Sequence, residues 1–171
     1  MLIRGALALA LMAPAAAAET VHFCWQGDNG YTMTGRMEFP DALALAPLIT
    51  EDDVTAFRII GYRDGVTLGS WDMETREDDA TWYLRYLPQR MEFPVDAMIP
   101  GPFDQGWNAD GSASDCGNPG FGFNAGNHAQ DFCVNGEWIE ESGMPPPTPF
   151  FAMTEPPPTP DCSGPMLMSK S

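Results

Sequence analysis

The sequence predicts an all-β protein, an antiparallel β-sandwich with a long disulfide-braced loop and a proline-rich C-terminal tail. Its 17 glycines and 17 prolines make up about a fifth of the chain, against ~12% in average proteins, and such frequent interruption of the backbone favours short strands over helices. Hydrophobic residues make up 44% of the chain, enough to fill a core and to argue against general disorder. We expect a leader over residues 1–18, one β domain over 19–143 and the tail over 144–171.

The N-terminal segment has the three parts of a secretory leader. Arg4 supplies positive charge, residues 5–12 form an apolar run too short to span a bilayer, and residues 16–18 are three alanines before Glu19. We therefore expect cleavage after Ala18, export to the periplasm or to the outside of the cell, and no membrane insertion of the mature protein.

The clearest local structure is a hairpin between residues 21–26 and 31–39. In the second segment apolar and polar side chains alternate, which is typical of a strand with one buried and one exposed face. Asn29 and Gly30 readily adopt positive φ, so this pair predicts the tight turn that closes the hairpin.

Short turns are expected after this hairpin. Residues 41–48 are rich in alanine and leucine but contain Pro47, so they predict either a helical turn or a loop. Thr50 and Asp53 have the spacing of a capping box, which predicts a single capped turn.

A second hairpin follows these turns. Its strands are predicted over residues 54–62 and 66–71, with the turn at 63–65. The acidic residues 72–79 then predict a surface loop, and residues 81–87 predict another strand.

Proline and glycine dominate the next part of the domain. Residues 91–95 predict a short strand that Pro94 confines to the edge of a sheet, since proline has no N–H to donate. Residues 100–126 predict a long loop, because glycine, proline, asparagine and aspartate recur throughout. Strands are expected again over residues 130–134 and 137–140, joined by a tight Asn-Gly turn.

The C-terminal segment contains an internal repeat. The pentapeptide Pro-Pro-Pro-Thr-Pro at residues 145–149 recurs at 156–160. Such segments adopt extended polyproline II structure and often serve as spacers or recognition strips. Because Cys162 follows the second copy, we expect the tail to be tied back onto the domain.

The four cysteines allow three disulfide pairings. We favour Cys116 with Cys133, which flank a glycine-rich loop and a strand, and Cys24 with Cys162. No Cys-x-x-Cys spacing occurs, so a redox or zinc site is not indicated.

The charge of the chain restricts its partners. It has 24 acidic and 8 basic residues, a net charge of −16. Phosphate backbones and anionic membrane surfaces repel such a chain, so binding to nucleic acid or to a membrane surface is disfavoured. The acidic residues keep an exported protein soluble, and clusters of them can bind divalent cations.

The loop over residues 104–115 is the candidate calcium site. Asn108, Asp110 and Asp115 supply neutral and anionic oxygen atoms within eight positions, which is the ligand chemistry that calcium prefers. The loop does not match an EF-hand: when Gly111 is aligned with the turn glycine, glycines occupy both the first and the last ligand position. The same residue types also form ordinary turns, so calcium is the one candidate cofactor and not an assigned one.

Five tryptophans raise the possibility of stacking against a sugar ring. Four of them lie in predicted strands, where burial is the common outcome. Trp107 lies in the long loop and is the candidate ligand platform.

Catalytic patterns are weak in this sequence. Only His22 and His128 can act as imidazole bases, and no Gly-x-Ser-x-Gly motif occurs. His128 precedes Asp131 by three residues, which allows an orienting pair, although it reads more simply as part of a turn. A glycosidase-like pair of carboxylates is compatible with so many acids, but none can be selected.

A pattern of glycine and aromatic spacings extends over residues 20–140. It consists of Phe23, Trp25, Gly27, Gly30, Tyr31, Gly35, Ile49, Thr50, Asp53, Val54, Phe57, Leu68 and Gly69. This pattern resembles that of a group of uncharacterised exported bacterial β-rich proteins, whose members often carry PEP-CTERM-type sorting tails. The resemblance implies an exported β domain with no activity to carry over. The chain lacks the hydrophobic, basic-ended anchor that such tails carry after the prolines.

The function expected from these observations is an exported, non-catalytic module for ligand binding or envelope structure, with a protein or a glycan as its partner. The first alternative is a calcium- or carbohydrate-binding module that uses the 104–115 loop. The second alternative is a hydrolase that uses carboxylates.

Overall fold

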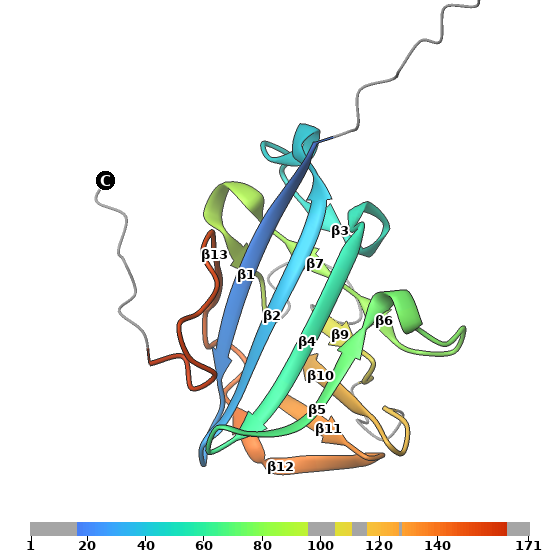
Figure 1. Ribbon diagram of the computed structural model, residues 1–171, viewed down its shortest axis with the longest axis vertical. Coiled ribbons are helices and arrows are strands. Elements are labelled where there is room, and N and C mark those ends of the chain that lie inside the picture. Colours follow the sequence, from blue (N-terminus) through green and yellow to red (C-terminus); the bar gives the residue numbers. More distant parts are fainter. Residues whose placement is uncertain (1–16, 96–104, 111–115, 127, 164–171) are drawn as a thin grey trace, which may run out of the picture.

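The computed structural model describes residues 17–95, 105–110, 116–126 and 128–163, which fold into antiparallel β-sheets (Figure 1). The larger sheet, in the order β5-β4-β2-β1-β13-β8, consists of β1 (Ala18–Gln26), β2 (Tyr31–Pro40), β4 (Ala56–Arg63), β5 (Val66–Asp72), β8 (Glu92–Phe93) and β13 (Phe150–Met153). The second sheet, in the order β12-β11-β10-β9-β6, consists of β6 (Trp82–Tyr83), β9 (Gln105–Trp107), β10 (Phe121–Ala125), β11 (Gln130–Val134) and β12 (Glu137–Met144). A short ladder joins β3 (Ile49–Thr50) to β7 (Arg85–Tyr86). The 3-10 turns are η1 (Asp41–Leu43), η2 (Glu51–Asp53), η3 (Met73–Thr75) and η4 (Pro88–Arg90).

Tight turns join three of the strand pairs where the sequence predicts them. The turn between β1 and β2 has φ of 52° at Asn29 and 79° at Gly30. Positive φ at both central residues gives the twist that a two-residue hairpin requires. The other two turns, at Asp64-Gly65 and Asn135-Gly136, have the same pair of positive φ angles.

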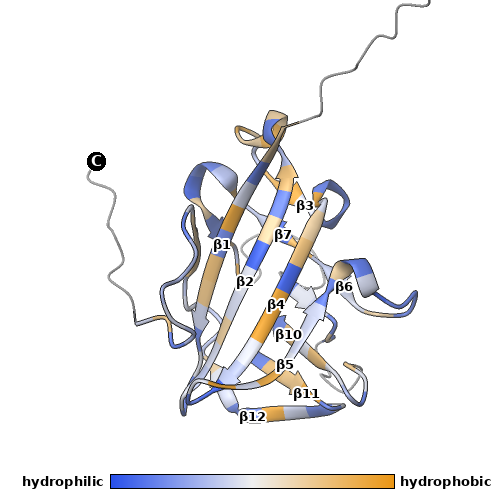
Figure 2. Cartoon of the chain, viewed as in Figure 1, coloured by the Kyte–Doolittle hydropathy of each residue, from blue (hydrophilic) through white to orange (hydrophobic). Residues whose placement is uncertain are grey.

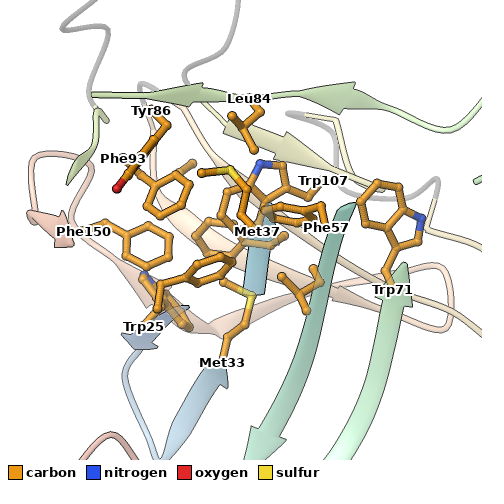
Figure 3. Close-up of a cluster of buried hydrophobic side chains, with 14 of the residues drawn as sticks. Trp25, Met33, Met37, Phe57, Trp71, Leu84, Tyr86, Phe93, Trp107 and Phe150 are labelled. Atoms are coloured by element: carbon orange, nitrogen blue, oxygen red, sulfur yellow. The ribbon is translucent and has the colours of Figure 1, made fainter. Parts of the chain in front are cut away.

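One core lies between the six-stranded and the five-stranded sheet (Figure 3). Both sheets contribute aromatic rings to it. The ring centroids of Trp25 and Phe132 lie 4.9 Å apart, and those of Phe23 and Trp107 lie 5.5 Å apart. Hydrophobic and hydrophilic residues alternate along much of β2, as the predicted period of two requires (Figure 2). Along β4 it is burial that alternates.

The predicted turns after the first hairpin are present. η1 is the helical turn that was one of two alternatives for this segment. Oδ2 of Asp53 accepts hydrogen bonds from N of Thr50 at 2.9 Å and from Oγ1 of Thr50 at 3.1 Å. The capped turn is therefore confirmed.

The strands between residues 81 and 95 are shorter than predicted. β8 lies at the edge of its sheet, as Pro94 requires. The continuous strand predicted over residues 81–87 is wrong, because β6 pairs with β9 whereas β7 pairs with β3. Leu84 separates the two strands and is fully buried, so the chain passes from one ladder to the next inside the core.

The prediction of a loop over residues 100–126 is wrong where β9 and β10 lie. Every residue of both strands is buried, so neither shows the alternation that marks a half-exposed strand. Backbone atoms of Asn108 and Ala109, which directly follow β9, lie close to Gly122 of β10 and Gly106 of β9. A Cβ atom at Gly122 would lie 2.3 Å from the carbonyl oxygen of Asn108. Glycine in these strands therefore permits close approach of two backbone segments.

Strand structure continues past residue 143, where the sequence predicts the tail to begin. β12 continues to Met144, and β13 pairs with β1 on one side and with β8 on the other. Phe150 of β13 is only 2% exposed and belongs to the core. Strand β13 lies between two proline-rich segments, and their composition predicts a tail where this strand lies.

The expected cleavage site lies at the start of β1. Ala18 is the first residue of this strand and is opposite Pro40, so a chain that begins at Glu19 loses one pair of the ladder. Residues 1–16 lie outside the described residues, and cleavage stays a prediction. In the part of the chain that the structure describes, no helix has the length and apolarity to cross a membrane.

Candidate functional site

Trp107 does not form an exposed ligand platform, so that prediction is wrong. The residue lies in β9 and is 0% exposed. Its ring centroid is 4.7 Å from that of Phe57 and 5.1 Å from that of Phe123. Because β9 points this side chain into the core, Trp107 stabilises the fold and cannot stack against a ligand (Figure 3).

The candidate calcium ligands are described only in part. Nδ2 of Asn108 donates hydrogen bonds to the carbonyl oxygens of Cys116 at 3.1 Å and Phe121 at 2.9 Å, so this amide ties the loop to β10. Asp110 is half-buried, and Asp115 lies outside the described residues. Within the described ranges, no group of three or more histidine, cysteine or acidic residues is placed to hold a metal ion. A calcium site in this loop stays a prediction.

Both favoured disulfides are present. Cys24 and Cys162 are joined across 138 positions of sequence, with 5.6 Å between Cα atoms. Cys116 and Cys133 are joined across 17 positions, with 6.0 Å between Cα atoms. Two disulfides and no free cysteine indicate an oxidising location outside the cytoplasm.

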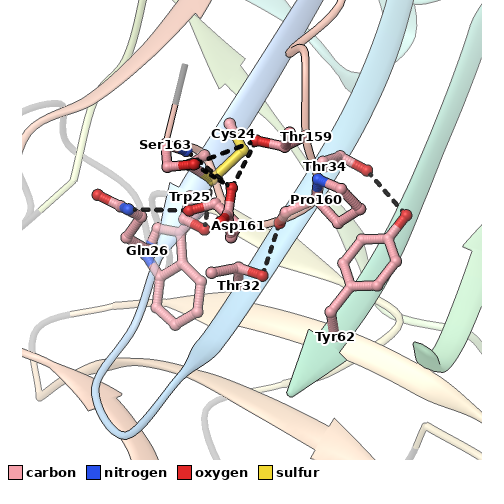
Figure 4. Close-up of a disulfide and its surroundings, with 11 residues drawn as sticks. Cys24, Trp25, Gln26, Thr32, Thr34, Tyr62, Thr159, Pro160, Asp161 and Ser163 are labelled. Carbon is pink, nitrogen blue, oxygen red and sulfur yellow. Dashed lines mark hydrogen bonds between the residues drawn. A yellow bond between two sulfur atoms is a disulfide. The ribbon is translucent and has the colours of Figure 1, made fainter. Parts of the chain in front are cut away.

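The second proline repeat folds back over the outer side of the six-stranded sheet (Figure 4). We call residues 156–163 the strap. Oγ1 of Thr32 donates a hydrogen bond to the carbonyl oxygen of Pro160 at 2.7 Å, and Nε2 of Gln26 donates to that of Asp161 at 3.1 Å. Together with the Cys24–Cys162 bridge, these bonds hold the strap against β1 and β2.

The end of the strap is a hydrogen-bonded turn around Asp161. Oδ1 of Asp161 accepts bonds from N of Ser163 at 3.0 Å, from Oγ of Ser163 and from Oγ1 of Thr159. These donors lower the pKa of the Asp161 carboxyl to about 2, because they stabilise its charged form. The Asp161 carboxylate therefore stays ionised, and keeps these hydrogen bonds, well into the acidic range, in a turn that contains Cys162.

A groove of about 290 Å³ separates part of the strap from the sheet, and we call it the strap groove. Its floor is the outer side of β1, β2 and β4, and its wall is the proline repeat. The lining residues are His22, Thr34, Gly35, Arg36, Arg58, Ile60, Tyr62, Pro156, Pro157, Pro158, Thr159 and Pro160.

A row of basic side chains crosses the floor of the strap groove. His22 of β1 is the register partner of Arg36 on β2, and Arg36 is the register partner of Arg58 on β4. Arg36 forms an ion pair with Glu38, and Arg58 one with Asp72 at 3.8 Å. The two arginine side chains are 53% and 58% exposed, so both guanidinium groups remain accessible to a ligand.

The imidazole of His22 is the less basic member of this row. Partial burial lowers its pKa, the positive charge of Arg36 lowers it further, and Glu155 opposes the shift. His22 is therefore neutral at pH 7, when one ring nitrogen donates and the other accepts a hydrogen bond. Beside it, the hydroxyl groups of Thr34 and Tyr62 lie 3.4 Å apart.

No local pattern in the sequence predicts this site. Arg36 lies on the exposed face of β2, and its partner Arg58 on β4 follows from a strand register that no local pattern contains. The strap is bonded to Cys24 through Cys162, which lies 138 positions further along the sequence. The wall and the floor of the groove therefore come from distant parts of the sequence. The signal that was present is the proline repeat followed directly by Cys162.

The orienting pair of His128 with Asp131 that the sequence allows is not supported, because His128 is exposed whereas Asp131 is buried. His22 lies in the strap groove, and His128 is exposed between β10 and β11. The carboxylate of Asp131 is buried and forms side-chain hydrogen bonds with Trp138 and Asn124.

The chain matches no known protein family model, no curated protein and no solved structure. The resemblance to exported bacterial β-rich proteins therefore stays a prediction from the spacing of its glycines and aromatic residues.

Proposed function

We propose that this protein is an exported, non-catalytic β-sandwich module that binds a ligand in the strap groove. The main support for the proposal is that the strap is held firmly against the sheet and still leaves a groove. The chain uses a disulfide and two side-chain hydrogen bonds to hold the strap against the sheet, and a largely open groove of about 290 Å³ remains between the prolines of the strap and the outer side of the sheet. A strap with a purely structural role would gain more by packing against the sheet along its whole length, because burial of apolar surface is favourable.

The size and the lining of the groove support ligand binding. Its volume is at the lower end of the ~300–1,000 Å³ of small-molecule sites, so the ligand is small or only one part of it enters. The lining combines apolar proline and isoleucine side chains with a few polar groups from three strands, as binding sites commonly do.

Export is supported by the leader-like N-terminus, by the two disulfides and by the resemblance to exported bacterial proteins. The glycan alternative now applies to the strap groove, since Trp107 is buried. A protein partner also remains a candidate for the strap groove, because the terminal residues of its chain fit a groove of this size.

A variant that fills the strap groove tests the proposal. Ile60 lies on the floor, and Ile60→Trp adds bulk there. Ser70 is its register partner on β5, is exposed and does not line the groove, so Ser70→Trp is the matched control. A library of sugars, short peptides and small organic acids is screened by thermal shift against the wild-type protein and both variants.

We expect ligands that raise the melting temperature of the wild-type protein and of Ser70→Trp but not of Ile60→Trp. Ligands that stabilise all three proteins equally would place binding elsewhere. A library with no ligand for the wild-type protein would count against a binding function, and turnover of any member would contradict its non-catalytic character.

A further inference from the structure

We propose that the strap groove takes a small carboxylate-bearing ligand whose carboxylate lies between the guanidinium groups of Arg36 and Arg58. The inference rests on the proposed function and names the chemical class of its ligand. It is carried by the register of the two arginines, by the carboxylates that already pair with them and by the apolar wall above them.

Arg36 and Arg58 are directly opposite each other on neighbouring antiparallel strands. Side chains in this arrangement are close together, and like charges there destabilise a sheet. The chain has only 8 basic residues against 24 acidic ones, and two of those 8 face each other in the groove. An anion bound between the two guanidinium groups would reduce the repulsion between their positive charges.

The existing ion pairs favour a carboxylate. Glu38, two positions after Arg36 on β2, pairs with Arg36, and Asp72 of β5, the register partner of Arg58, pairs with Arg58. Such exposed pairs contribute little to stability, so a ligand carboxylate can replace either partner at little cost. Arginine binds carboxylates through two parallel hydrogen bonds, which gives this exchange a defined geometry.

Nearby acidic groups restrict the charge of the ligand. Glu38 and Asp72 lie beside the arginines, and the charge of Glu155 acts on His22. A dianion such as phosphate meets more repulsion from these groups than a carboxylate with a single charge does.

The remainder of the groove accommodates the body of the ligand. The proline wall and Ile60 provide apolar contact, while the hydroxyl groups of Thr34 and Tyr62 and the ring of His22 provide hydrogen bonds. This combination fits a carboxylate attached to a partly apolar body, such as an organic acid, a sugar acid or the C-terminus of a peptide.

Three acids and their neutral counterparts test the proposal. The probes are hexanoate with hexanamide, D-galacturonate with D-galactose, and N-acetylglycine with N-acetylglycinamide, and inorganic phosphate is a further probe. Binding is followed by NMR, through the backbone amides of residues 34–36 and 58–60 and the Nε–H groups of the arginines. The acid with the highest affinity identifies which of the three sources supplies the carboxylate.

We expect at least one acid to bind about threefold or more tightly than its neutral counterpart, as the modest strength of ion pairs at exposed arginines allows. Arg36→Gln and Arg58→Gln should each weaken the binding of this acid by a similar factor, about threefold. Arg63→Gln removes the same charge from the end of β4, outside the groove, and should leave binding unchanged. Melting curves establish that the three variants are folded.

Equal binding of acids and neutral counterparts, or equal binding to wild type and both groove variants, would overturn the proposal. So would binding of phosphate at these arginines when no acid binds. If a neutral ligand binds in the groove of the wild-type protein but not of Ile60→Trp, the ligand is not a carboxylate, and the proposed binding function is still supported. If no ligand of any kind binds in the groove, both the carboxylate proposal and the proposed binding function are wrong.

Discussion

The indole N–H of Trp25 donates a 2.8 Å hydrogen bond to Oε1 of Gln130, and this bond joins the two sheets inside the core. Trp25 belongs to β1 of the six-stranded sheet and Gln130 to β11 of the five-stranded sheet. Nε2 of Gln130 in turn donates to the carbonyl oxygens of Pro146 at 3.0 Å and Thr148 at 2.7 Å. One fully buried side chain therefore fixes both sheets and the first proline repeat.

This arrangement predicts different costs for the same substitution at two buried tryptophans. Trp25→Phe removes a donor and leaves Oε1 of Gln130 without its partner, whereas the indole N–H of Trp107 has no acceptor to lose within the described structure. Leaving a buried polar group unpaired costs about 1–3 kcal/mol. Trp25→Phe should therefore lower the free energy of unfolding by that much more than Trp107→Phe, as measured by urea denaturation.

The control for this comparison is the full truncation Trp107→Ala, which should cost about 3–5 kcal/mol because it leaves a cavity among the aromatic rings. A small cost for Trp107→Ala would mean that Trp107 is not in the core. Equal costs for the two phenylalanine variants would mean that the Trp25–Gln130 bond contributes nothing to stability.

The disulfides should have distinct effects. In the chain-entropy model the Cys116–Cys133 bridge contributes roughly 3 kcal/mol and the Cys24–Cys162 bridge nearly 5, because the second closes a much longer loop. Cys162→Ser should also release the strap, and limited proteolysis with mass analysis should find cuts after β13. Cys116→Ser should leave the strap protected. Equal protection of the strap in both variants would show that its hydrogen bonds hold it without the bridge.

Much of the six-stranded sheet could be predicted because its information is local. The alternation along β2 and the turns at Asn29-Gly30 and Asp64-Gly65 each lie within a few residues of sequence. The same holds for the capped turn formed by Thr50. Local patterns fix which residues pair in a hairpin, since turn type and register are linked.

The misjudged parts depend on contacts between distant segments. β9 and β10 are covered on both sides, so the alternation that would identify them is absent. β13 reads as part of a proline tail because its pairing with β1 and β8 involves residues far away in sequence. The strap groove could not be predicted for a similar reason, because its wall and its floor are far apart in sequence.

Calcium binding to the 104–115 loop stays a prediction with its own test. If Asn108, Asp110 and Asp115 bind the ion, millimolar calcium should raise the melting temperature, since a ligand of the native state stabilises it. The double variant Asp110→Ala with Asp115→Ala should lose this increase and still fold without calcium. A melting temperature that responds neither to calcium nor to a chelator would leave the loop with a structural role only.

Removal of the leader can be measured directly. The exported protein should begin at Glu19 and carry no titratable thiol, because residues 16–18 form a small-residue cleavage site and all four cysteines are bridged. Intact-mass analysis with thiol labelling of natively exported protein checks both points. A mass that includes residues 1–18, or two or more reactive thiols, would contradict the prediction.

Asp131 should make stability depend on pH. Burial raises the pKa of its carboxyl, while hydrogen bonds from Trp138 and Asn124 oppose the shift. A carboxyl with a folded pKa above its unfolded value of 3.8 costs stability when charged, and the cost disappears as pH falls through the folded pKa. Asp131→Asn removes the charge, so it should raise the free energy of unfolding at pH 7. Urea denaturation from pH 3 to pH 8 should show this gain shrinking toward acid, while the exposed control Asp78→Asn shows no such trend. An Asp131→Asn variant less stable than wild type at pH 7 would show that the charged carboxylate is needed where it lies.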